Sequence, residues 1–157
     1  MERDRERDEE HLVFVIRATN IVESKMKQVI YTFIQAPTER VDFVESHLLN
    51  NATIPFGAKV KLVLFIAKSL SVKVDREAMY TLLSRRNAFA HQDHLKSVRI
   101  VTDGRGYPDV SLVVESIKNS GELETVTQSR AAAEFMAAYG TVDADLDALL
   151  TAMGATP

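Results

Sequence analysis

Three side chains near the middle of the chain carry functional groups suited to phosphodiester chemistry. They are Arg86, Asn87 and His91, within the string Arg-Asn-Ala-Phe-Ala-His. Asn87 and His91 are four residues apart and share one helical face, and the long side chain of Arg86 can reach the same place. An imidazole moves a proton near neutral pH, a guanidinium grips phosphate with two hydrogen bonds, and an amide orients either group. The pattern therefore predicts a phosphate-handling site.

The stretch around these residues is basic although the whole chain is acidic. The formal net charge is −3, and residues 2–10 alone hold six acids against three bases. Between residues 85 and 105, five bases stand against two acids, a local excess of three positive charges. A basic patch of this kind can hold a phosphate backbone even on an acidic protein.

The spacing of apolar residues predicts the helices that position these groups. Apolar residues recur at three- and four-residue steps in several segments, as in amphipathic helices. The segment 57–70 is apolar nearly all round and is expected to be a central helix buried on most sides, and Asp75 is a suitable N-cap for the helix that follows. The predicted helices cover residues 8–34, 41–49, 57–70, 76–91, 129–138 and 144–153.

After the predicted site the apolar pattern changes from helix to strand. Residues 97–102 and 109–116 are rich in valine and isoleucine and flank the turn sequence Asp-Gly-Arg-Gly-Tyr-Pro, which is typical of a hairpin. Residues 123–126 are a third short strand candidate. The expected fold class is mainly α: an antiparallel helical bundle with a small antiparallel hairpin or three-stranded meander after the motif helix.

Length and composition indicate a single domain over residues 1–157. Apolar residues make up 46% of the chain, enough for a core without disulfides, and there is no cysteine. The charged residues 1–10 are expected to fray or to act as an interaction tail, and residues 97–127 form the β insertion. The chain has no signal-peptide pattern and no apolar run of about 20 residues. We expect a cytoplasmic protein that does not associate with membranes.

The motif resembles that of the HEPN superfamily (higher eukaryotes and prokaryotes nucleotide-binding). The mark of that family is an arginine, four to six further residues and a histidine, often with a polar residue directly after the arginine. Arg86, Asn87 and His91 match it with four intervening residues. A preceding helix of the type Gly57-x-Lys59-x-x-Leu62 is also a recurrent layout in the family. The resemblance covers roughly residues 10–95, and the rest agrees only in the order of elements.

The resemblance implies a homodimeric endoribonuclease in which two motif helices face each other across a shared cleft. His91 would activate the ribose 2′-hydroxyl, Arg86 would stabilise the charged phosphate and Asn87 would help position the RNA, without metal or cofactor. Many members are toxins or antiphage factors, and several pair with a nucleotidyltransferase partner, so an antitoxin or regulatory partner is expected. The expected RNA-phosphate contacts are Arg85, Lys96, Arg99 and Arg105.

Two departures from the family favour an alternative function. The toxin branch usually carries a tyrosine two residues after the histidine, and here that residue is Asp93, a poor neighbour for RNA phosphate. The added strands and the length look more like the mannitol operon repressor branch, whose members are regulators or binding proteins without an established reaction. That branch tends to lack the arginine-histidine pair. The alternative is therefore a non-catalytic, HEPN-like dimeric regulatory or interaction protein.

Other interpretations of the site residues stay open. In one alternative, Arg86 and His91 have no role in chemistry and only cap the carbonyls at the helix end. His91, Asp93 and His94 are a candidate metal site, although the leading hypothesis needs no metal.

Two further groups of charged residues need an interpretation. Three aspartates resemble the start of a calcium loop, but the glycine and glutamate that such a loop requires are missing, so we expect helix-capping acids. These are Asp143, Asp145 and Asp147. Three lysines around the buried helix can either extend to solvent or line an RNA groove, and the sequence does not decide between these roles. These are Lys59, Lys68 and Lys73.

Overall fold

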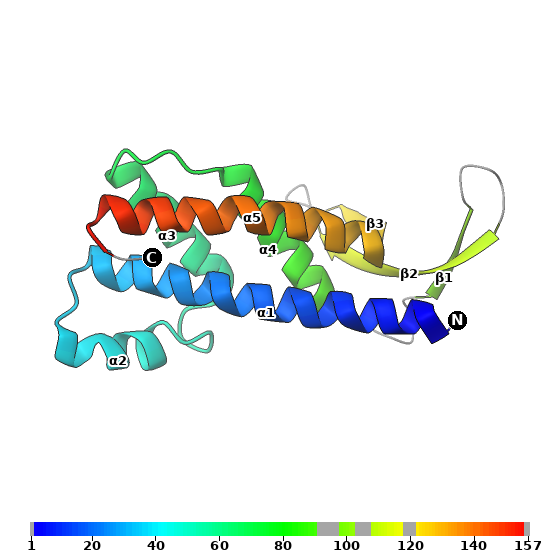
Figure 1. Ribbon diagram of the computed structural model, residues 1–157, viewed down its shortest axis with the longest axis horizontal. Helices are drawn as coiled ribbons and strands as arrows, with labels where there is room; N and C mark the ends of the chain where they lie inside the picture. Colours follow the sequence, from blue (N-terminus) through cyan, green and yellow to red (C-terminus); the bar gives the residue numbers. More distant parts are fainter. Residues whose placement is uncertain (1, 91–97, 103–107, 118–121, 156–157) are drawn as a thin grey trace.

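The computed structural model describes residues 2–90, 98–102, 108–117 and 122–155. The protein is a helical bundle with a small antiparallel sheet, so the predicted mainly helical fold class is confirmed (Figure 1). The main elements are α1 (Glu2–Phe33), α2 (Val41–Phe43), α3 (Phe56–Ser69), α4 (Arg76–Ala90), β1 (Val98–Thr102), β2 (Pro108–Ile117), β3 (Leu123–Thr127) and α5 (Gln128–Ala152). A 3-10 turn (Thr38–Arg40) precedes α2, and a π-helical turn (Val44–Leu48) follows it.

The helix that carries the motif begins where the sequence predicts. Asp75 caps α4, since the backbone N–H of Ala78 donates to Asp75 Oδ1 at 2.9 Å. A side-chain acceptor at this position satisfies one of the four N–H groups that a helix leaves unpaired at its start. α4 then continues to Ala90 and ends its described part there.

The prediction of two C-terminal helices, 129–138 and 144–153, is wrong, because α5 is one helix from Gln128 to Ala152. Gly140 lies between the two predicted segments, and glycine inside a helix costs about 1 kcal/mol relative to alanine. Ala138 and Val142 on either side are buried. Packing of this face against the bundle outweighs the cost of the glycine.

The three aspartates that were predicted to be helix-capping acids lie inside α5, so none of them caps that helix. Lys25 Nζ on α1 lies 2.7 Å from Asp143 Oδ1 and 2.7 Å from Asp147 Oδ1. Asp145 Oδ2 accepts a hydrogen bond of 2.7 Å from the backbone N–H of Asp75, at the start of α4. The three carboxylates therefore join α5 to α1 and α4.

The two long helices α1 and α5 lie side by side and run in the same direction (Figure 1). Phe14 makes edge-to-face contacts with Phe135 and Tyr139, with ring centroids 6.3 and 6.1 Å apart, and further along both helices Lys25 meets Asp147. α4 runs the opposite way, because its start meets the second half of α5 and its end meets the first half.

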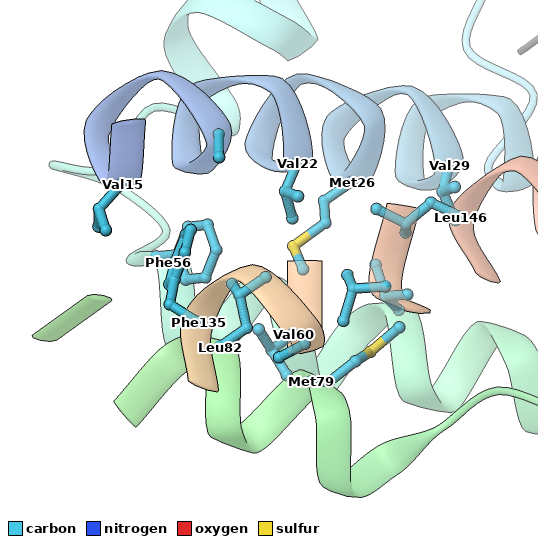
Figure 2. Packing of buried hydrophobic residues seen from close by; sticks show 14 of the residues in the cluster. Val15, Val22, Met26, Val29, Phe56, Val60, Met79, Leu82, Phe135 and Leu146 are labelled. Atoms are coloured by element: carbon cyan, nitrogen blue, oxygen red, sulfur yellow. The ribbon is translucent and has the colours of Figure 1, made fainter. Parts of the chain in front are cut away.

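The core lies where α1, α3, α4 and α5 meet (Figure 2). Its centre consists of completely buried apolar side chains, each worth about 1.5–3 kcal/mol of transfer free energy. Labelled examples are Val22, Met26, Val60, Met79, Leu82, Phe135 and Leu146. α3 departs from the prediction of burial on most sides, since Phe65 is 64% and Leu62 is 38% exposed. Only the face of α3 toward α1 and α4 is covered.

The sheet is a meander in which β2 pairs with a different neighbour along each half. Residues 108–112 pair with β1, and residues 113–117 pair with β3, both antiparallel. Val113, Val114 and Val126 are buried, which fixes the second ladder to the bundle, whereas β1 lies beyond the end of the helices (Figure 1). Among the described residues, no helix is both long and apolar enough to span a membrane.

Candidate functional site at the end of α4

Arg86, on the last described turns of α4, is half-buried and is held by neutral partners. Its guanidinium carbon lies 5.7 Å from the centroid of the Phe56 ring, and Nη1 donates to Asn87 Oδ1 at 3.1 Å. Phe56 is the first residue of α3 and is 3% exposed, so the ring that supports Arg86 is part of the core. Within the described ranges Arg86 forms no ion pair with a carboxylate. Its charge is oriented but not neutralised there.

Asn87 is also half-buried and contacts the guanidinium of Arg86 directly. The structure therefore brings together two of the three predicted motif residues, and both belong to the same turn of α4. His91, the third, lies outside the described residues. A guanidinium and an amide held next to each other offer a phosphate several hydrogen-bond donors at a partly accessible position.

Arg85, the neighbouring arginine, is bound by the protein itself. It is 8% exposed, and it donates from Nε to Glu134 Oε2 at 2.6 Å and from Nη1 to Glu124 Oε2 at 2.8 Å. Burial acts to lower the pKa of Arg85, but the two carboxylates outweigh it and raise the pKa above the ordinary value. Both acids hold the charge of Arg85 inside the fold.

The other predicted phosphate contacts are not described at side-chain level. Arg99 is on β1, in the ladder beyond the end of the bundle, and Lys96 and Arg105 lie outside the described residues. The candidate metal ligands after α4 lie outside them as well. In the ranges that are described, no three histidine, aspartate or glutamate side chains gather as a metal site.

A buried charged cluster centred on Lys59, one turn after Phe56 on α3, was not predicted from the sequence. Lys59 is 0% exposed, and its Nζ donates to Glu23 Oε1 at 2.7 Å and to Asn51 Oδ1 at 2.8 Å. Asn51 Nδ2 closes the ring by donating to Glu23 Oε2 at 2.9 Å. Lys59 thus neither extends to solvent nor lines a groove, whereas Lys68 and Lys73 are exposed.

One signal for this cluster was present in the sequence. Glu23 lies on the apolar stripe of α1, directly after Val22 and three residues before Met26, both of which are fully buried. A carboxylate at such a position requires a buried cation or several donors. Burial acts to raise the pKa of Glu23, but the hydrogen bonds from Lys59 and Asn51 and the charge of Lys59 lower it below its ordinary value.

Comparison of the chain with models of protein families, with curated proteins and with solved structures finds no match.

Proposed function

We propose that the protein is a metal-independent endoribonuclease of the HEPN type that acts as a homodimer through Arg86, Asn87 and His91. The observation that supports this proposal is the contrast between two adjacent arginines. Arg85 is buried between two glutamates, whereas Arg86 is half-buried against Phe56 and Asn87 and has no acidic partner in the described ranges. An oriented cation whose charge is not neutralised is suited to a phosphate.

In the proposed reaction, the His91 imidazole accepts the proton of a ribose 2′-hydroxyl. The 2′-oxygen attacks the adjacent phosphorus and forms a 2′,3′-cyclic phosphate, while the bond from phosphorus to the 5′-oxygen breaks. The leaving 5′-oxygen takes a proton from water. Arg86 stabilises the negative charge on the phosphate oxygens in the transition state, and Asn87 orients the phosphate or the guanidinium.

The test is incubation of the purified protein with a defined RNA in the presence of EDTA. Wild type is expected to cut and to leave 2′,3′-cyclic phosphate ends, and His91→Ala is expected to be inactive while it stays folded by circular dichroism. The matched control is His47→Ala, which removes an exposed histidine stacked on Phe43, with ring centroids 5.5 Å apart. An RNA with a single 2′-deoxyribose at the cut position should resist cleavage there.

Several results would overturn the nuclease. They are absence of cleavage by wild type, equal cleavage by wild type and His91→Ala, or cleavage at the 2′-deoxy position. A toxin or defence role, a cytoplasmic location and a nucleotidyltransferase-type partner are further parts of the same proposal. They hold only if wild type cleaves RNA.

The alternative function is a non-catalytic, HEPN-like dimeric regulatory or interaction protein, related to the mannitol operon repressor branch. It is favoured by exposed apolar side chains on α3, where Leu62 and Phe65 are one turn apart and at least 38% exposed. Adjacent exposed apolar residues of this kind are common at protein interfaces. This alternative predicts no turnover of any RNA and predicts that Phe65→Ser weakens self-association in sedimentation experiments.

A further inference from the structure

An ion cluster at the junction of α4, β3 and α5 holds the residue directly before Arg86. Arg85 bridges Glu134 on α5 and Glu124 on β3, with N to O distances of 2.6 and 2.8 Å. Glu134 also accepts a hydrogen bond of 2.8 Å from Nε of Arg130, one turn earlier on α5. Burial acts to raise the pKa of Glu134, but Arg130 and Arg85 lower it. A single buried guanidinium thus joins three elements.

The two arginines fix α4 from two sides. Consecutive helical residues point about 100° apart, and here Arg85 is directed to α5 and β3 while Arg86 is directed to Phe56 on α3. Helix ends fray and their final turns are the least constrained part. The bridge through Arg85 is made five residues before the last described residue of α4, so it resists rotation of the turn that carries Arg86.

The residue types support a geometric role for this bridge. A guanidinium is a rigid planar fork that can hold two carboxylates in fixed directions, whereas a lysine ammonium is a point charge on a flexible stem. Arg85 uses two different nitrogens for its two glutamates. Lysine at this position keeps the charge but loses the fixed angle between the two partners.

We propose that Arg85 is a positioning residue: its bridge to Glu124 and Glu134 fixes the rotation of the end of α4 and holds Arg86 against Phe56 in the orientation that binds the substrate phosphate. This inference rests on the proposed function and deepens it. Small displacements of a positioned group cost rate more than affinity when the group acts on the transition state. The sheet and α5 therefore contribute to the site without touching the substrate.

The experiment compares Arg85→Lys with wild type in two measurements. The first is kcat and KM on a defined RNA, well below the Tm of each variant. The second is the NMR resonance of the Arg86 Nε–H group, which we expect the ring current of Phe56 to displace, since the guanidinium carbon lies 5.7 Å from the ring centroid. Phe56→Leu supplies the value of that resonance without the ring. The matched control is Arg130→Met, which removes a 66% exposed partner of Glu134 without touching α4.

We expect Arg85→Lys to lower kcat about tenfold while KM stays within about twofold of wild type. The Arg86 resonance should move toward its value in Phe56→Leu. Arg130→Met should change neither quantity. A folded Arg85→Lys protein with wild-type kcat and an unmoved Arg86 resonance would overturn the inference, because a bridge that only stabilises the fold has no effect on either.

The two proposals fail in different ways. If wild type does not cut RNA, the proposed nuclease is overturned and the NMR measurement alone decides the positioning role of Arg85. A moved Arg86 resonance then supports that role, and an unmoved one overturns it. If Arg85→Lys does not fold, Glu124→Gln serves as the second variant, because it keeps a hydrogen-bond acceptor at a position that is 24% exposed.

Discussion

Two cations near the start of α3, Lys59 on the helix itself and Arg86 against the ring of Phe56, are held in opposite ways. Lys59 is completely buried in a closed ring of hydrogen bonds with Glu23 and Asn51. Arg86, supported by Phe56 one turn earlier on α3, is half-buried and has only neutral partners in the described ranges. One positive charge is neutralised inside the fold, and the other is oriented at its edge.

The difference indicates how to separate structural from ligand-binding charges. Removing an ion from water costs several kcal/mol, so a buried cation persists only with matched partners, and those partners leave nothing for a ligand. A half-exposed arginine that lies on an aromatic ring keeps its hydration and its free hydrogen-bond donors. By this criterion Lys59 and Arg85 are structural charges, and Arg86 is the candidate for ligand binding.

The largest expected effect is on stability, at the buried cation. Lys59→Met leaves Glu23 buried without its charge partner, and we expect it to lower the free energy of unfolding by about 3–5 kcal/mol. Urea denaturation measures the loss. Because two apolar side chains can replace a buried pair, Lys59→Met combined with Glu23→Leu should recover most of it. A loss below about 1 kcal/mol in the single variant, typical of surface pairs, would remove the distinction between the two cations.

At the other cation the expected effect is on activity. Arg86→Ala should lower kcat for RNA cleavage about 100-fold or more, because it removes charge stabilisation of the transition state. Its Tm should change little, since the side chain is half-buried and has no ion pair in the described structure. Arg130→Ala is the control for loss of an exposed arginine. A large fall in Tm with normal kcat per folded molecule would make Arg86 a structural residue.

Acid should weaken the ion pairs of Glu23 with Lys59 and of Glu134 with Arg85 and Arg130. The pKa of Glu23 and that of Glu134 are lowered in the fold from an ordinary value of 4.5. Groups with a depressed folded pKa contribute stability that is complete above the unfolded pKa and is lost as the pH falls through the folded pKa. We therefore expect the urea concentration at the unfolding midpoint to decrease once the pH is below about 4.5.

The control is the Lys59→Met and Glu23→Leu double variant, in which the urea midpoint should decrease less in acid. Acid should also lower the free energy of unfolding of wild type by less than Lys59→Met does, because protonation of Glu23 removes a charge but keeps both side chains. An identical pH dependence in wild type and in the double variant would contradict a role for Glu23.

A substitution away from both regions has the smallest expected effect. Gly140→Ala should raise the free energy of unfolding by about 0.5–1 kcal/mol, because alanine loses less backbone entropy in a helix. A Cβ atom built at this position meets nothing within 4 Å. Thermal denaturation measures the gain. Destabilisation instead would mean that the middle of α5 needs the glycine, contrary to the continuous helix observed.

The repeat of apolar residues was sufficient to find most elements. α3 and α4 match the predicted segments, whereas α1 begins six residues earlier than predicted, at Glu2. Asp75 caps α4 as expected, and the strands follow the change of period after the motif. These features are local, since the burial of one face leaves its spacing in the sequence. The same local reasoning failed in α5, where it predicted two helices, because packing against other helices outweighs the intrinsic preference of Gly140.

What the sequence alone established was the set of functional groups and the helix that carries Arg86 and Asn87. Only the tertiary structure decided which charges are available. Lys59 finds Glu23 36 residues away in the chain, and Arg85 finds Glu134 49 residues away. No local pattern encodes such a pairing, because it depends on which helix faces pack together. Two adjacent arginines that are equivalent in the sequence therefore differ in the fold: one side chain points into a cluster of acids, and the other lies on an aromatic ring at the edge of the bundle.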